Sequence, residues 1–127
     1  MKDSALKNFR ILSLAFVLTL LSVGHVAAAP LSTTEKQKIE TLIREVHDLK
    51  DASFIRNGST YNSSNAATFL RRKWHANQSE VRTAHDFIEK IASVSGTSGK
   101  PYLIRFKDGK EIHSRDFLLA KLKSLEG

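Results

Sequence analysis

The apolar residues of this 127-residue chain are concentrated at its N-terminus, and this limits what the chain can fold into. Residues 1–28 hold 17 apolar side chains, among them a charge-free run of 13 residues from Ile11 to Val23. Lys2, Lys7 and Arg10 precede the run, and small residues follow it. A basic start, an apolar middle and a small-residue end are typical of a secretory signal peptide. The folded domain must then be built from the other 99 residues.

The apolar run is too short for a membrane anchor, because crossing a bilayer core takes about 20 residues. We expect cleavage between Ala28 and Ala29, since small side chains precede that bond and a cut one residue later would leave Pro30 first. The chain has no cysteine, which excludes a lipoprotein anchor and disulfides. The sequence therefore predicts a cleaved signal peptide, 1–28, and a single globular periplasmic domain, 29–127.

The composition of residues 29–127 allows one modest core. These residues include 35 apolar, 17 basic and 12 acidic side chains, a net charge of +5. A chain of this size buries somewhat over 60% of its unfolded surface. Multidomain machinery is excluded, and packing alone must hold the fold. Residues 100–127 carry 7 basic and 4 acidic side chains, so an anionic partner is expected at the C-terminal half.

An amphipathic helix is predicted over residues 31–50. It opens with the capping box Ser32-x-x-Glu35, which would satisfy two backbone donors. Spacings of three and four make one apolar stripe, and Glu40 and Arg44 are spaced for an ion pair on the opposite side. The stripe consists of Ile39, Leu42, Ile43, Val46 and Leu49.

Two short hairpins are predicted from their turns. Asn57-Gly58 suits a two-residue turn with positive φ, which places Phe54 opposite Tyr61. A three-residue loop ending at Gly109 places Ile104 opposite Ile112 and Arg105 opposite Glu111. A two-residue turn about Asp108-Gly109 would instead place Arg105 against Ile112, and we favour the first register.

Further helices are predicted from Ser63 or Ser64, from Ser79 to Val94 with Gly96 after its end, and from a Ser114 cap. Each hairpin is thus followed by a helix. The fold class is α+β, with about four amphipathic helices packed on two short β-hairpins whose strands can share one small antiparallel sheet.

Four strings of the sequence carry a resemblance to a known family. They are "FIRNGSTY", "FLRRKW", "TAHDFI" and "IASVSGTSGKPYLIRF", and they follow an exported leader. With them the chain resembles the YfeK-like family of small Gram-negative periplasmic proteins of unknown function, over roughly residues 33–106. The resemblance implies a location and a shape, and it brings no catalytic residues.

Neither a phosphate loop nor a metal site is predicted. "GTSGKP" has Val94 where a P-loop needs glycine and Pro101 where it needs Ser or Thr, so we interpret it as a helix stop before a strand. An anion nest of backbone donors in Ser95–Lys100 is the alternative. His47, His75, His85 and His113 show no metal-ligand spacing, and no cofactor is expected. Ser114 beside His113 is better explained as a helix cap than as a nucleophile.

The basic string Arg71-Arg72-Lys73-Trp74-His75 is expected to be a solvated helix face around a core Trp74. Arg56 and Arg105 are more informative, because each interrupts an apolar strand where a charge must be paired or exposed. If the hairpins pair, both arginines and Lys100 could line one wall suited to a carboxylate or phosphate. The alternative for Arg105 is an edge charge or a cross-strand pair with Glu111.

These observations favour a non-enzymatic binding or interaction module with a mildly cationic surface. Its partner would be an anionic envelope component or a periplasmic protein, and nucleic acid is excluded by the location. One alternative is a small envelope hydrolase with His75 or His113 as base, and another is an inhibitor of a secreted enzyme presenting Ser95–Lys100. The candidate surface consists of Arg56, Tyr61, Arg71, Lys100, Tyr102 and Arg105.

Overall fold

The computed structural model describes residues 31–127, which form one compact unit. The predicted signal peptide and its cleavage site lie outside the described residues. No helix within 31–127 is long and apolar enough to cross a bilayer. The elements follow in the order α2 (Thr33–His47), β1 (Ser53–Arg56), β2 (Ser59–Tyr61), α3 (Ser63–Ala76), α4 (Ala84–Asp86), β3 (Leu103–Arg105), β4 (Glu111–His113) and α5 (Ser114–Glu126).

The four strands form one antiparallel sheet in the order β2-β1-β3-β4, so the predicted α+β fold is confirmed. Both hairpin registers are as predicted, with Phe54 opposite Tyr61 and Ile104 opposite Ile112. The hairpins join through β1 and β3, where Phe54 faces Ile104. Both turns use positive φ at glycine, 81° at Gly58 and 90° at Gly109.

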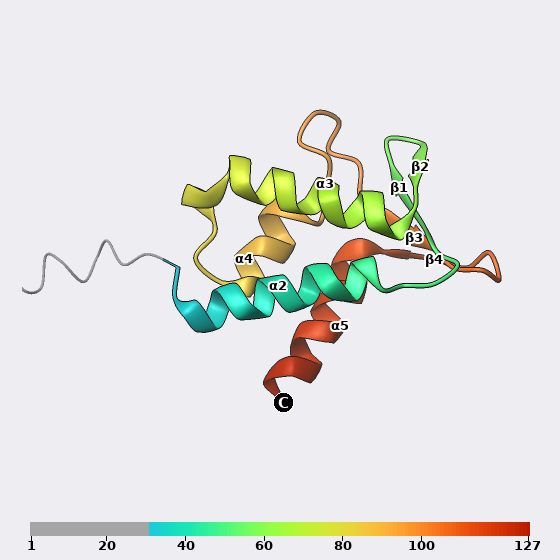
Figure 1. The fold of residues 1–127 in the computed structure, drawn as a ribbon. Coiled ribbons are helices and arrows are strands. Elements are labelled where there is room, and N and C mark those ends of the chain that lie inside the picture. The colour runs from blue at the N-terminus through green and yellow to red at the C-terminus, as the bar shows by residue number, and fades with distance from the viewer. Residues whose placement is uncertain (1–30) are drawn as a thin grey trace, which may run out of the picture. The chain divides into compact units, whose positions relative to one another are not determined.

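Helix α2 lies beside α3 and also contacts α4 and α5 (Figure 1). Its predicted stripe is buried at Ile39, Leu42, Ile43 and Val46. Half of the predicted capping box forms, since the Ser32 side chain accepts from the Glu35 N–H at 3.2 Å.

The Glu35 carboxylate does not return to Ser32, and this part of the prediction is wrong. It accepts a hydrogen bond from the backbone N–H of the buried Ala84 at 2.7 Å and thereby ties the start of α4 to α2. That hydrogen bond and the Lys38 ammonium lower the pKa of Glu35. Sequence spacing suggests a local partner for Glu35, while the folded chain supplies one from a distant segment.

The predicted cap residues, Ser63 or Ser64 for α3 and Ser114 for α5, are wrong, because each cap lies earlier in the chain. Asn62 caps α3 by accepting from the Asn65 N–H at 2.8 Å, so Ser63 is the first helical residue. His113 stands at the N-cap of α5, and Ser114 begins that helix. Ser114 is buried, and its N–H donates to the Tyr102 carbonyl at 2.9 Å, which ties the start of α5 to the residue before β3.

The continuous helix predicted from Ser79 to Val94 is wrong. A 3₁₀ turn occupies Gln78–Glu80, α4 begins only after Thr83, and a π-helical segment, Phe87–Ile91, ends the element. Thr83 is extended and caps α4 by accepting from the Asp86 N–H at 2.9 Å, which prevents an earlier start. The turn of the π-helical segment is wider than an α-helical turn, and Phe87, Ile88 and Ile91 are all buried in it. Val94 lies beyond it in a bridge with Pro101.

Candidate functional site

Three of the predicted site residues, Arg56, Tyr61 and Tyr102, meet where the end of β1 lies under α3. The Arg56 guanidinium stacks over the Phe69 ring at 4.6 Å from its centroid and donates to the Tyr61 hydroxyl at 3.0 Å. Phe69 also contacts the Tyr102 ring edge-on, with 5.8 Å between centroids. The aromatic rings therefore hold the guanidinium in place at the end of β1.

A second cation, Lys73 of α3, approaches the same group of rings. Its Nζ donates to the Tyr102 hydroxyl and to the Val94 carbonyl, both at 2.9 Å, and lies 4.9 Å from the centroid of the Tyr102 ring. Tyr102 is almost fully buried. We call Arg56, Tyr61, Phe69, Lys73 and Tyr102 the Tyr102 cluster.

Neither cation of the Tyr102 cluster forms an ion pair within the part of the chain that the structure describes. Among residues 31–127, no carboxylate oxygen lies within 4.0 Å of the side-chain nitrogens of Arg56 or Lys73. Burial lowers the pKa of Lys73, and the charge of Arg56 lowers it further. Burial also raises the pKa of the Tyr102 phenol. The cluster is thus a positively charged, partly desolvated site that no acidic residue of the described chain neutralises.

A small cavity of about 30 Å³ opens beside the Arg56 guanidinium. This volume suits one water molecule or one methyl group. Its lining is mostly apolar and combines the sheet, α3 and the start of α5. It consists of Phe54, Ile55, Arg56, Tyr61, Ala66, Phe69, Leu70, Tyr102 and Ser114.

The expected wall of Arg56, Lys100 and Arg105 does not form. Arg105 pairs across the sheet with Ser53, so it points to the face opposite that of Phe54 and Arg56. Its guanidinium donates to the Glu111 carboxylate at 2.7 Å from Nε, which is the predicted cross-strand pair. Lys100 is exposed in the loop before β3.

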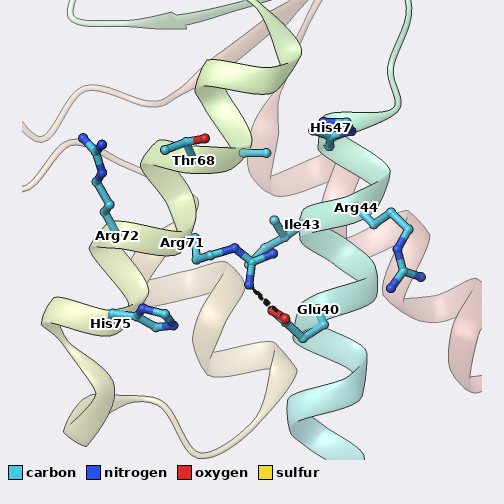
Figure 2. A pocket seen from close by; sticks show the side chains of 9 residues that line it. Glu40, Ile43, Arg44, His47, Thr68, Arg71, Arg72 and His75 are labelled. Atoms are coloured by element: carbon cyan, nitrogen blue, oxygen red, sulfur yellow. Dashed lines mark hydrogen bonds and ion pairs between the residues drawn. The ribbon is translucent and has the colours of Figure 1, made fainter.

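Arg71, the sixth predicted residue, lies in a groove of about 440 Å³ between α2 and α3. Its Nη1 donates to both oxygens of Glu40, one of them at 2.8 Å (Figure 2). Glu40 therefore pairs across the groove, and its predicted pairing with Arg44 is wrong. The groove is lined by Glu40, Ile43, Arg44, His47, Ala67, Thr68, Arg71, Arg72 and His75.

The loop Ser95–Lys100 is braced against the first hairpin. The Asn57 amide donates to the Ser95 hydroxyl at 3.1 Å, and Asn57 also accepts from Ser98. The N–H groups of Ser95, Gly99 and Lys100 donate to acceptors within the loop. These donors are used internally, which leaves fewer backbone N–H groups for an anion, and the anion nest considered for this loop stays a prediction.

The histidines considered as catalytic bases are dispersed. His113 is exposed at the start of α5, next to the buried Ser114. His75 lines the groove with Glu40, whose two oxygens are held by Arg71. No cluster of three metal-ligating side chains occurs within residues 31–127.

The sequence reasoning missed Phe69 and Lys73. Lys73 was grouped with its neighbours Arg71 and Arg72 as part of a solvated face. The spacing of four between Phe69 and Lys73 would have placed both on the helix stripe that faces Tyr102. Trp74 is buried, as predicted.

Comparisons with known proteins show the family of the chain. The chain matches the model of a family of unknown function, DUF5329, over residues 33–126, so the match extends past Phe106 through the second hairpin and α5. It is 35% identical over 88 residues to the uncharacterized protein YfeK of Salmonella typhimurium, which covers 69% of each chain. No solved structure matches it. The chain belongs to the DUF5329 family, which includes proteins similar to YfeK.

Proposed function

We propose that the protein is exported to the periplasm and acts there as a non-enzymatic binding module. It takes an anionic group of an envelope component at the Tyr102 cluster. The leader supports export, since residues 1–28 have the basic, apolar and small-residue order of a signal peptide. The binding role rests on the cluster's geometry.

The observation that carries the binding role is the convergence of Arg56 and Lys73 on Tyr102, where no carboxylate of residues 31–127 pairs with either cation. Two like charges close together in a partly desolvated place repel each other. A bound carboxylate or phosphate would relieve that repulsion and accept hydrogen bonds from the guanidinium, the ammonium and the phenols. An anion therefore gains more here than at an arginine that is already paired, such as Arg105.

The cavity beside Arg56 restricts the group next to the anion. It is mostly apolar and about 30 Å³ in volume, which leaves room for a methyl group and not for a longer chain. A carboxylate that bears a short alkyl group suits both the charge and the cavity. An inorganic phosphate would satisfy the cations and leave the cavity unused.

Binding is tested by titrating the protein with acetate, propionate and phosphate at constant ionic strength, with NMR detection. We expect the ring signals of Tyr61, Phe69 and Tyr102 to shift. Arg56→Gln should weaken binding about tenfold, because a hydrogen bond to a charged group contributes about 1.5–3 kcal/mol. Arg105→Gln, which removes an equal charge on the other face of the sheet, is the control. Equal weakening by both variants would reject the site.

Export is tested by measuring the intact mass of the protein in fractionated cells. We expect a product in the periplasm that begins at Ala29 and lacks the first 28 residues. Full-length protein retained in the cytoplasm would contradict the proposed location. It would not test binding at the Tyr102 cluster, which the titration tests separately.

A further inference from the structure

The groove between α2 and α3 is separate from the Tyr102 cluster, and it combines cationic rims with an apolar floor. Both walls are helical, and the two helices lie side by side (Figure 1). Ile43 and Ala67 are buried and line the floor. Arg44 extends from the α2 side and Arg72 from the α3 side, both pointing outward from the gap (Figure 2). An entering chain would therefore meet apolar side chains below and a guanidinium on each side.

The ion pair at the middle of the groove leaves donors unused. Arg71 contacts Glu40 through Nη1 alone, and its Nε and Nη2 make no hydrogen bond to any residue in 31–127. Its side chain is 42% exposed. A guanidinium has five N–H donors, and its Nε–Nη2 edge matches a carboxylate in bidentate fashion. Arg71 can therefore neutralise Glu40 and still bind a second carboxylate.

The charge of the groove favours an acidic ligand. Its lining has three arginines and, within the described residues, one carboxylate, which is already paired. Neither Arg44 nor Arg72 forms an ion pair with a residue in 31–127. Arginine rather than lysine at all three positions suits planar carboxylates.

The length of the groove sets the size of the ligand. Glu40 and His47 both line it and are seven residues apart on α2, which corresponds to about 10 Å at 1.5 Å per residue. About three residues of an extended peptide cover that length, and successive side chains of such a peptide point to opposite sides. The middle side chain would face the floor formed by Ile43 and Ala67, where an apolar side chain gains contacts.

We propose that the α2–α3 groove binds an extended acidic segment of a partner protein, in which an apolar residue lies between two carboxylate residues. The central residue packs on Ile43 and Ala67. One carboxylate binds the open edge of Arg71, and the other binds the guanidinium at one rim of the groove, that of Arg44 or that of Arg72. The partner class is defined by charge complementarity and by the alternation of side chains along the groove.

The test uses the full folded protein and an acetylated, amidated peptide of sequence Glu-Ala-Glu, with methyl NMR detection. We expect shifts of the Ile43 and Ala67 methyl signals, and none with Gln-Ala-Gln at the same concentration. Arg71→Gln should weaken binding about tenfold. Arg71→Gln also breaks the contact with Glu40, so the double variant Arg44→Gln, Arg72→Gln provides a second test. It disturbs no side-chain hydrogen bond or ion pair within residues 31–127, and it should weaken binding about threefold or more.

Three results would overturn the proposal. One is the absence of methyl shifts at millimolar peptide, and another is equal binding of the neutral peptide. The third is a groove that binds polyphosphate or a sulfated glycan while it ignores the peptide. Arg56→Gln is the matched control, because it alters the Tyr102 cluster and should leave peptide binding unchanged. If the peptide does not bind the groove, the proposed anion binding at the Tyr102 cluster is unaffected. If the anion titration of the Tyr102 cluster fails, the proposal for the groove is unaffected.

Discussion

Replacing Phe87 by alanine is expected to lower the free energy of unfolding by about 3–5 kcal/mol. The Phe87 side chain is fully buried, and its ring meets Trp74 edge-on with 6.0 Å between centroids. It also begins the π-helical segment that brings Ile88 and Ile91 into the core. A domain of this size has a free energy of unfolding of only about 5–15 kcal/mol, so this one substitution would remove a large part of it.

The matched control is Phe117→Ala in α5, which deletes the same side chain at a half-buried position. Its loss should be about 1–2 kcal/mol, since less apolar surface is removed from contact. Urea denaturation followed by circular dichroism measures both values. Equal losses for the two variants would mean that Phe87 is not the centre of the core.

The hairpins were predictable because their information is local. Asn57-Gly58 and Gly109 set the turn geometry, and the turn sets the register of every pair in its hairpin. The stripe of α2 was equally readable, since its spacing of three and four repeats over four buried residues. Where one segment specifies its own geometry, the sequence was sufficient.

The failures arose where a distant partner decides the outcome. Glu35 turns from Ser32 to the N–H of Ala84, which is 49 residues away. The predicted helix of residues 79–94 has a good apolar period, yet the Thr83 cap and the burial of Phe87, Ile88 and Ile91 split it into short pieces. No local pattern contains these contacts.

The residues of the candidate site were predicted only in part, because a contact between distant strands decides which of them lie together. Arg56 and Arg105 each follow an apolar residue in a strand, and this equivalence suggested a shared wall. The pairing of Ser53 with Arg105 places the two arginines on opposite faces of the sheet, because neighbouring residues of a strand alternate. The register between β1 and β3, which no turn specifies, decides the outcome for each arginine. Arg105 pairs with Glu111, while Arg56 forms no ion pair within residues 31–127.

Arg56→Glu is expected to reduce anion binding at the Tyr102 cluster by more than about a hundredfold. The change removes the guanidinium donors and places a negative charge where the ligand's charge would lie. The same carboxylate would attract the ammonium of Lys73, whose pKa the native arginine helps to lower. That attraction offsets the loss of the contacts with Tyr61 and Phe69.

The free energy of unfolding should therefore change by less than about 1 kcal/mol, while binding is lost. A purely structural role for Arg56 predicts the reverse, because a residue needed for packing would lower stability when it is replaced. Arg105→Glu is the control for charge reversal on the sheet. It should leave binding unchanged and should cost some stability, since it faces Glu111.

The decisive measurement is an isothermal titration of the folded wild type and of folded Arg56→Glu with acetate, whose methyl group matches the cavity. Urea denaturation measures the stability of each protein separately. The account predicts saturable binding by the wild type, with none detectable in a variant of nearly unchanged stability. Binding that survives in Arg56→Glu would show that the uncompensated cations at Tyr102 hold no anion.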